Sequence, residues 1–569
     1  MKYAFLIICF LLSVLAKADV IHISNQEDFD KIAYAISKRL KDGQTRIDVK
    51  FKPGQYYFKE AHIKGAGWNY PNVTLNFVGY GSVLIPVGNK YTNLDNIYNG
   101  GNPEKSCWIN ESLVEISGWS DTYQSISSVD VLDMKAGQCR IKSPVSVADY
   151  IYNERFPISI LITEWYLGAT YKVDRIKDSY VYFTVPDLQK TSLGFNVNWD
   201  YGYGQQHPRF RFFNALFLND GRVDMKSCKS LYECTASSFL DVSNSSFNKI
   251  SIKGLSFVGN ADGKSLIDFS SVKANNIVLY GCRFRYIHGS CIGISNTANV
   301  LIKKCYFEDC QSNGIMASNT SRDVQILSNR FLRVGKNLTN SRVITVAGEN
   351  FIVRDNYIQD FCYAAIGVGV WYGTKKDNRC SGIIERNEIC YSSEYFDNAW
   401  KYTLMDAGAI YTFTKMDDVT IRGNYIHDFT GVKDYRGIFC DDGAQNIKIY
   451  GNILNNIKSS YDIDLRYTSA ANVAKYVPDF NTNNLIYGNI MDGYYRFEGI
   501  PDKDDRCVHR SNYLVGDGSL QKSNSVKNLQ KQDEDVFLSG KSSVCVGKEN
   551  IRLLKKTDNW KYYKRYNIK

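Results

Sequence analysis

The hydrophobic and polar positions of the chain repeat as one unit from about residue 250 onward. In each unit a strand-like run ends in Gly or a polar residue, followed by Asn or Cys, an aromatic or aliphatic pair, and a polar turn. The Asn or Cys position recurs at residues 282, 305, 329, 356, 387, 424, 452 and 489, so the spacing varies between 23 and 37 residues. A period near ~20–25 residues with loop insertions is typical of a solenoid in which each unit forms one coil.

The residues inside each unit predict strands and no helix. Short β-branched runs such as 419–421 and 447–449 recur, and no unit has an amphipathic helical stretch. Asn at one place in successive coils predicts an internal ladder of side-chain amides, and Cys282 and Cys305 occupy the same position, which predicts buried thiols. We therefore predict an all-β protein whose fold is a right-handed parallel β-helix.

The remaining segments predict caps and an insertion around this solenoid. Asp28–Leu40 has the pattern of an amphipathic capping helix, which a solenoid needs because an uncovered coil end is an aggregating edge. β-rich runs with hairpin-like spacing interrupt the repeat and predict a small inserted β-domain. The predicted divisions are 1–18 signal peptide, 19–104 cap and first coils, 105–200 insertion, 201–500 β-helix and 501–569 C-terminal cap or tail.

The first residues predict export from the cytoplasm. Lys2 precedes an apolar run from Ala4 to Ala16, and Ala16-Lys17-Ala18 is a small-x-small cleavage site. No later stretch approaches the ~18 apolar residues of a membrane span. We expect a periplasmic or secreted monomer, in which some cysteines can pair. Cys107–Cys139, Cys228–Cys234 and Cys507–Cys545 are conceivable pairs, although sequence does not give connectivity.

Net charge and composition narrow the class of partner. The formal net charge of +10 falls to +8 when Lys2 and Lys17 leave with the signal peptide, and it is dilute over the chain. A nucleic-acid footprint needs clustered Lys and Arg, so we expect no nucleic-acid partner. The six histidines show no zinc-ligand spacing, and Gly367-Val368-Gly369 lacks the strand–helix context of a dinucleotide site. We expect no metal and no cofactor.

Polar residues gather in three consecutive units of the repeat, at 405–411, 435–443 and 461–467. Aligning Ile410, Ile438 and Ile463 as inward residues places Tyr411, Phe439 and Asp464 in one outward column. Phe413, Asp441 and Arg466 then form the next column. Successive coils lie about 4.8 Å apart, so repeated outward positions form a preorganised row. The alignment predicts that five aspartates, Arg436, Arg466 and several tyrosines converge on one patch.

Such a patch suits glycoside hydrolysis, which needs one carboxylic acid and one carboxylate beside a sugar held by aromatic rings. For direct contact with substrate we select residues in and around the patch: Arg436, Arg466, Asp464, Asp462, Tyr411, His427 and Trp371. His427 is expected in a turn beside the patch, and Trp371 at the end of a preceding coil. Asp-Gly is also ordinary turn chemistry, so Asp441-Asp442-Gly443 can instead close a strand.

The repeat and these motifs resemble the pectin-lyase-like right-handed β-helix superfamily. The motifs Asp-Ala-Gly-Ala-Ile-Tyr (406–411) and Arg-Gly-Ile-Phe-Cys-Asp-Asp-Gly (436–443) resemble those of secreted bacterial glycoside hydrolases of the family 141 type. The resemblance implies two catalytic aspartates on nearby coils, Asp406 and Asp442, with Asp441 as the substitute if the register is shifted by one.

Three functions remain open at this point. The first is an exported glycoside hydrolase that acts on a polysaccharide or oligosaccharide. The second is a polysaccharide lyase or uronate epimerase on the same scaffold, with Ca²⁺ neutralising an acidic substrate. The third is a glycan-binding β-helix protein without catalytic activity, in which the aspartates are turn residues.

Overall fold

The computed structural model describes most of the predicted solenoid. The described residues are 19–58, 62–86, 238–260, 265–287, 289–335, 341–369, 380–402, 406–429, 435–457, 461–466, 483–491 and 493, with short strands between 106 and 233 and after 494. The predicted signal peptide and both cysteine pairs other than Cys107–Cys139 lie outside them. Among the described helices, none combines the length and apolar character that crossing a bilayer requires.

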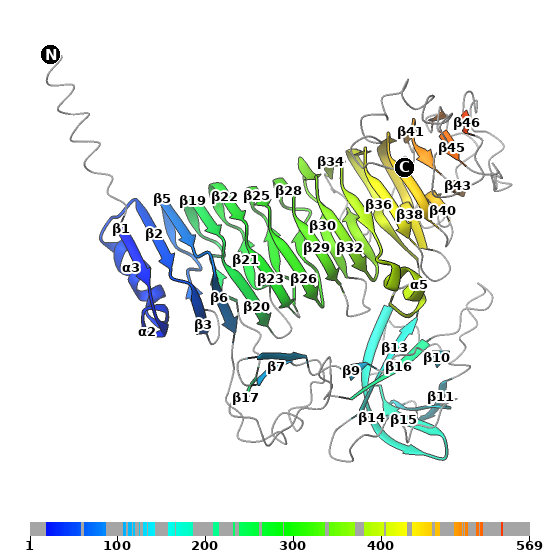
Figure 1. Cartoon of the computed structure of the whole chain (residues 1–569), viewed down its shortest axis with the longest axis horizontal. Helices are drawn as coiled ribbons and strands as arrows, with labels where there is room; N and C mark the ends of the chain where they lie inside the picture. The colour runs from blue at the N-terminus through cyan, green and yellow to red at the C-terminus, as the bar shows by residue number, and fades with distance from the viewer. Residues whose placement is uncertain are drawn as a thin grey trace.

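The chain forms coils that stack along one long axis, as Figure 1 shows. Each coil contributes strands to three faces, and every pairing between successive coils is parallel. The predicted parallel β-helix is confirmed. We call the three rows of strands face one, face two and face three.

Face one contains β4 (Ile63–Lys64), β18 (Leu240–Asp241), β21 (Ile267–Ser270), β24 (Ile292–Ser295), β27 (Ile315–Ala317), β30 (Arg342–Val346), β33 (Ala364–Val368), the first halves of β36 (Ala407–Arg422) and β38 (Tyr435–Tyr450), β40 (Tyr461–Arg466) and β43 (Tyr495–Glu498). Face two contains β1 (Asp19–Ile23), β2 (Arg46–Phe51), β5 (Asn69–Val78), β19 (Ser246–Lys253), β22 (Lys273–Tyr280), β25 (Ala298–Lys303), β28 (Arg322–Leu327), β31 (Phe351–Arg354), β34 (Ser381–Glu385), the second halves of β36 and β38, β41 (Leu485–Tyr487) and β44 (Val508–Arg510).

Face three contains β3 (Gly54–Phe58), β6 (Ser82–Pro86), β20 (Ser256–Asn260), β23 (Arg283–Ile287), β26 (Tyr306–Cys310), β29 (Arg330–Val334), β32 (Tyr357–Phe361), β35 (Glu388–Cys390), β37 (Tyr425–Phe429), β39 (Ile453–Ile457), β42 (Ile490–Met491), β45 (Tyr513–Val515) and β46 (Val536–Leu538). Parallel pairing therefore continues past residue 500. A further helix, α5 (Ser393–Tyr402), follows β35.

Two short helices, α2 (Gln26–Asp30) and α3 (Ile32–Lys41), lie between β1 and β2 at the N-terminal end of the solenoid (Figure 1). The side chain of Asn25 accepts a hydrogen bond from the backbone N–H of Asp28 and so caps α2. Lys31 separates the helices, with φ −91° and ψ 0°. The prediction of one helix over Asp28–Leu40 is therefore wrong in its bounds, although α3 does bury one apolar face against the solenoid through Ile32, Ile36 and Leu40.

Antiparallel strands occupy the region where the repeat is interrupted. They are β7 (Ser106–Ile109), β8 (Ser112–Glu115), β9 (Gly118–Trp119), β10 (Gln124–Ser125), β11 (Val129–Asp133), β12 (Gln138–Lys142), β13 (Ile158–Glu164), β14 (Leu167–Lys177), β15 (Tyr180–Thr184), β16 (Arg209–Asn214) and β17 (Leu231–Glu233). Among the strands that the structure describes, they pair only with one another. The antiparallel pairing extends past residue 200 as far as β17.

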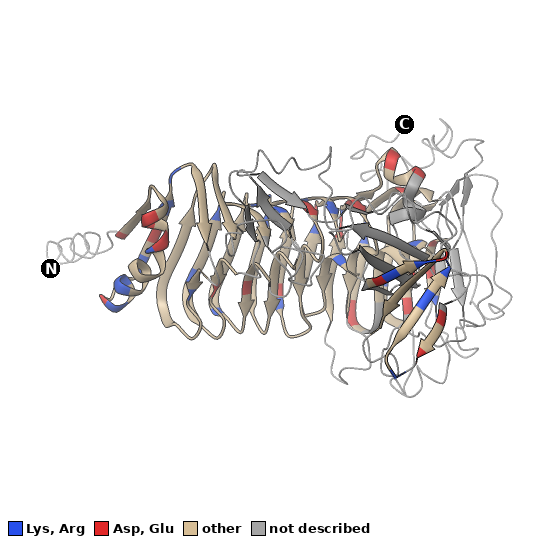
Figure 2. Cartoon of the chain, turned by 90° about the horizontal axis from the view of Figure 1, so that it is seen from below, with Lys and Arg blue, Asp and Glu red and all other residues tan. Residues whose placement is uncertain are grey.

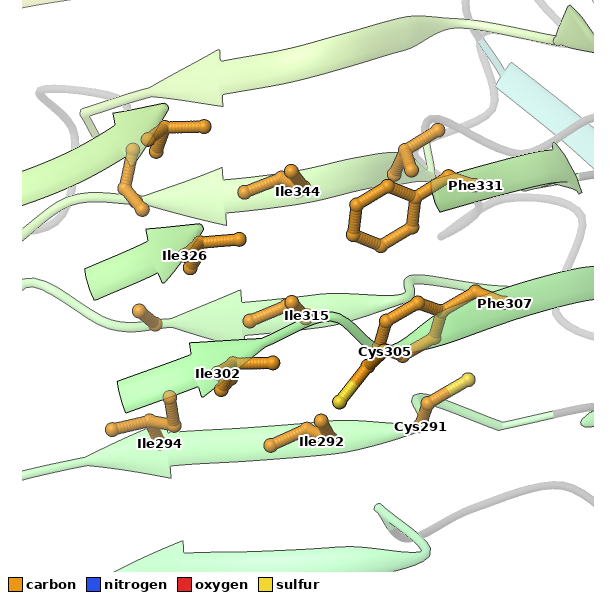
Figure 3. Close-up of a cluster of buried hydrophobic side chains, with 14 of the residues drawn as sticks. Cys291, Ile292, Ile294, Ile302, Cys305, Phe307, Ile315, Ile326, Phe331 and Ile344 are labelled. Atoms are coloured by element: carbon orange, nitrogen blue, oxygen red, sulfur yellow. The ribbon is translucent and has the colours of Figure 1, made fainter. Parts of the chain in front are cut away.

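The core is a narrow apolar column inside the coils (Figure 3), where Ile292, Ile315 and Ile344 stack on successive strands. On face three, the rings of Phe284, Phe307 and Phe331 form a second stack inside the coils, with successive centroids 4.7 and 4.5 Å apart. Because identical side chains recur at the coil repeat, each coil buries its apolar residues against the next.

The predicted asparagine ladder is present at the turns. Asn387 donates from Nδ2 to the carbonyl of Val353 (2.9 Å) and to Oδ1 of Asn424 (3.0 Å). Its own Oδ1 accepts from the backbone N–H and the amide of Asn356 at 3.0 and 2.9 Å. The amide therefore satisfies buried backbone groups that the turn would otherwise leave unpaired.

Cysteines in the described part of the chain are buried thiols: Cys139, Cys282, Cys291, Cys305, Cys310, Cys362, Cys380, Cys390 and Cys440. The expected burial of Cys282 and Cys305 is confirmed. The conceivable Cys107–Cys139 disulfide is wrong, since Cys139 is a free thiol, and burial raises its pKa to about 11.

Candidate functional site

The coils that carry the predicted patch are aligned as the sequence indicated. Ile410 pairs with Ile438 and Ile438 with Ile463, and all three side chains are buried in the core. Tyr411, Phe439 and Asp464 therefore share one outward column of face one, and Phe413 pairs with Asp441 in the next. The predicted register is confirmed, and it places Asp441 on the outward side of β38, because alternate residues of a strand face opposite sides.

Arg436 is the centre of an ion-pair chain. Its side chain is fully buried, and its Nε donates to Oδ2 of Asp464, also fully buried, at 2.9 Å. Its Nη1 donates to Oδ1 of Asp406 at 3.4 Å, and Nη1 of Arg466 reaches the same oxygen at 3.2 Å. The Arg436 guanidinium lies 4.0 Å above the ring centroid of Phe439, which excludes water from one of its faces. Two guanidinium groups thus stabilise the ionised form of Asp406.

Asp406 is held at the entrance to β36 in an unusual backbone conformation. Its φ is +52°, which Asp tolerates better than most residues because its short polar side chain can bond locally. Its side chain is 16% exposed, compared with complete burial for Arg436 and Asp464. Asp406 is therefore the carboxylate of the ion-pair chain that reaches solvent.

Asp441 lies in a contrasting, aromatic environment. The hydroxyl of Tyr411 donates to its Oδ2 at 2.8 Å. The ring of Tyr411 stacks on Phe439 at 4.9 Å and meets Tyr363 edge-on at 5.6 Å. Burial and then the charge of Asp441 raise the pKa of Tyr411 well above its usual value, so its hydroxyl keeps its proton and remains a donor. The charge of Asp406, on the preceding coil, adds to that rise.

Two residues of this site were missed by the sequence analysis, Arg342 and Tyr363. Arg342 lies in register with Ala364, and its guanidinium is 5.8 Å from the ring centroid of Tyr363 and 6.0 Å from that of Tyr411. Gly367 makes room for it, since a Cβ on Gly367 would lie 2.0 Å from Cδ of Arg342. A glycine within a strand is a signal of close approach by another group, and it was available in the sequence.

Burial changes the role of several predicted substrate contacts. Arg436, Asp464 and Asp462 are completely buried, and Tyr411 is nearly so. Asp462 accepts a hydrogen bond from the backbone N–H of Gly493 at 2.9 Å. The complete burial of Arg436, Asp464 and Asp462 argues against their direct contact with substrate and favours a role in holding Asp406, Asp441 and Arg466 in place.

His427 does not lie in a turn beside the patch. It is within β37 on face three, where its ring stacks on Tyr425 at 4.0 Å and its Nδ1 is 3.0 Å from Asp428. Burial lowers the pKa of His427, but the side chains of Asp428, Cys390 and Glu388 outweigh burial and raise it to about 11. The prediction was wrong because the strand continues through Tyr425–Phe429 after the asparagine turn.

The remaining predicted site residues stay predictions. Trp371 and the side chain of Asp442 lie outside the described residues. Within the described residues, no group of three or more His, Cys, Asp and Glu side chains is arranged to hold a metal ion.

The comparisons with known proteins concern the fold. The sequence model of the protein family described as right-handed β-helix region matches residues 217–382. A search of curated protein sequences finds no match to the chain. A solved structure titled "Glycoside hydrolase" covers 78% of this chain and 95% of its own, with 12% identity and a TM-score of 0.51. The catalytic domain of a GH87 α-1,3-glucanase in complex with nigerose covers 75% of this chain and 92% of its own, with 10% identity and a TM-score of 0.18, too low for an argument. The match to the right-handed β-helix region confirms the predicted right-handedness of the β-helix.

Proposed function

Starting from a chain that is a right-handed parallel β-helix, we propose that it is a carbohydrate-active enzyme that hydrolyses glycosidic bonds at the face-one patch. The observation that carries the proposal is the presence of two carboxyl groups in contrasting environments on adjacent coils of face one. Asp406 pairs with two guanidinium groups, whereas Asp441 accepts a hydrogen bond from the hydroxyl of Tyr411. The likeness in fold to a solved glycoside hydrolase agrees with it. The proposed substrate is a polysaccharide or oligosaccharide, and the proposed location is outside the cytoplasm.

The two carboxyl groups receive different roles. Asp406 is paired with Arg436 and Arg466 and remains ionised, so it acts as the nucleophile or as the base that activates water. Burial of Asp441 favours the protonated form of a carboxyl, whereas the hydrogen bond that it accepts from Tyr411 fixes its orientation and favours the ionised form, so the two effects oppose each other. Asp441 acts as the acid that protonates the leaving oxygen. Arg466, which is partly exposed, is available to bind substrate hydroxyl or acidic groups.

Substitution of each aspartate tests the proposal. Asp406→Asn and Asp441→Asn should each lower the hydrolysis rate by roughly 10²–10⁴-fold, the usual contribution of a positioned acid or base. Asp442→Asn tests the other candidate acid, and the exposed Asp418→Asn on β36 is the matched control, which should change the rate by less than about threefold. The assay is digestion of a polysaccharide panel, with reducing ends, product mass and ultraviolet absorbance as readouts, and with circular dichroism as a check of folding.

The outcomes separate the alternatives. Loss of activity only in Asp442→Asn would transfer the acid role to that residue. Full turnover in both Asp406→Asn and Asp441→Asn would remove the proposed site. Products that absorb in the ultraviolet would indicate an unsaturated sugar, hence a lyase. Tight binding without cleavage of any glycan would indicate a binding protein.

A further inference from the structure

A second outward column, on face three, alternates arginine and tyrosine over four successive coils. Arg283 pairs with Tyr306, Tyr306 with Arg330 and Arg330 with Tyr357. The following residue of each strand points inward and is buried, so these four side chains point away from the core. Arg283 and Arg330 are exposed, and both tyrosines are half-buried.

The two exposed arginines of this column form no ion pair within the described part of the chain. Within the described residues, neither Arg283 nor Arg330 has a carboxylate at ion-pair distance, and Arg330 instead lies 4.8 Å above the ring centroid of Tyr357. The adjacent arginines differ, because Arg285 pairs with Glu308 at 3.0 Å and Arg333 with Asp309 at 2.8 Å. Figure 2 shows basic and acidic residues interspersed along the coils.

The spacing of the two exposed arginines is fixed by the coil repeat. On the same strands, the stacked rings of Phe284, Phe307 and Phe331 lie 4.7 and 4.5 Å apart. Arg283 and Arg330 are two coils apart, so their backbones are separated by about 9–10 Å along a rigid sheet. This is close to the length of one disaccharide in an extended glycan.

We propose that the column Arg283, Tyr306, Arg330 and Tyr357 is a non-catalytic binding site for an acidic polysaccharide in which a carboxylate or sulfate recurs on every second sugar. Each guanidinium binds one acidic group in a bidentate manner, and the tyrosines contact the sugars between them. The site lies on a different face and on earlier coils than Asp406 and Asp441, so it adds a binding function that is separate from the proposed hydrolysis.

The charge spacing favours such a glycan over a nucleic acid. Each strand of duplex DNA carries about one charge per 3.4 Å, so a nucleic-acid site needs more closely spaced cations than one in every second coil. The intervening carboxylates of Glu308 and Asp309, which hold the neighbouring arginines, would also repel a densely charged polyanion.

Affinity electrophoresis of the full chain tests this site without relying on catalysis. The protein carries Asp406→Asn and Asp441→Asn, so that cleavage does not alter the gel. The probes are hyaluronan, which has a uronate on every second sugar, neutral dextran, and single-stranded DNA. Arg283→Gln with Arg330→Gln should weaken hyaluronan binding roughly tenfold or more, since hydrogen bonds between ions are strong. The matched control is Lys50→Gln with Lys273→Gln, which removes two exposed charges from face two.

The control variant should bind hyaluronan like the parent protein. Arg283→Lys with Arg330→Lys should retain part of the affinity, because lysine keeps the positive charge but lacks the planar guanidinium that binds an acidic group through two hydrogen bonds. The proposal is overturned if the parent does not bind hyaluronan, or if the arginine double variant and the lysine control variant lose hyaluronan binding equally. It is also overturned if DNA binds as tightly as hyaluronan and depends on the same arginines. These results leave the proposed hydrolysis untouched, since that is measured separately by product release. Failure of hydrolysis with intact hyaluronan binding would overturn only the proposed function.

Discussion

The buried pair Arg436–Asp464 allows a quantitative test of how the face-one patch is held together. Both side chains are completely excluded from solvent, and Nε and Oδ2 are 2.9 Å apart. Replacing Arg436 by Met keeps much of the apolar volume over Phe439 but leaves the carboxylate of Asp464 without this buried cation. Removing one partner of a buried ion pair typically costs about 3–5 kcal/mol. We expect Arg436→Met to lower the free energy of unfolding of these coils by that amount.

Replacing both partners should recover most of the loss. An apolar pair of similar volume is often neutral or stabilising, so Arg436→Met with Asp464→Leu should be within about 1–2 kcal/mol of the original stability. Asp464→Leu alone should be destabilising, because the buried guanidinium of Arg436 loses the carboxylate of Asp464. The summed losses of the single variants should therefore exceed the loss of the double variant by about 3 kcal/mol or more, at or above the upper end for residues in direct contact.

Hydrogen exchange measured by mass spectrometry is the suitable assay, because coils of a solenoid can open independently and a single melting curve mixes them. Peptides from β36, β38 and β40 should lose protection in each single variant and regain it in the double variant. Peptides from the first coils serve as the internal control. A change below about 1 kcal/mol in Arg436→Met, or additive losses in the double variant, would refute the assignment of a buried, coupled pair. Glycan hydrolysis should stay low in the stable double variant, because Asp406 has still lost one guanidinium.

Three further predictions concern the ladder, the histidine and the glycine. Asn387→Ala should destabilise the coils by about 3–5 kcal/mol in urea unfolding, since it leaves several buried backbone groups unpaired, whereas the exposed Asn275→Ala should cost less than about 0.5 kcal/mol. The pKa of His427 is about 11 in the folded chain, above its ordinary 6.5, so its stabilising effect is complete below pH 6.5 and is lost as the pH rises towards 11. The difference in urea midpoint between the parent and His427→Gln should accordingly shrink between pH 6 and pH 10, and a difference that grows would contradict it. Gly367→Ala should cost about 1–3 kcal/mol by displacing Arg342, and Arg342→Ala in the same chain should relieve most of that cost, as thermal unfolding would show.

Much of the fold could be predicted from the sequence because successive coils of the solenoid use the same pattern of buried and outward residues. Each coil buries the same positions against the next, so the recurrence of Asn387 and its counterparts, and of Ile410 and Ile438, gave both the ladder and the register. The break between α2 and α3 at Lys31 was not readable, because it depends on local backbone geometry and not on apolar spacing. The position of His427 was misjudged for a related reason, since its polar neighbours resemble a turn although they continue a strand.

The sequence by itself determined the parallel β-helix, the inward and outward columns, and the gathering of aspartates on three coils. Only the tertiary structure decided which of those polar residues reach solvent. Arg436 and Asp464 neutralise each other inside the patch, whereas Asp406 remains partly exposed between two guanidinium groups. The reason is physical: strand alternation fixes the side on which a residue lies, but burial depends on the long side chains of adjacent coils, such as Arg342 folding over Gly367.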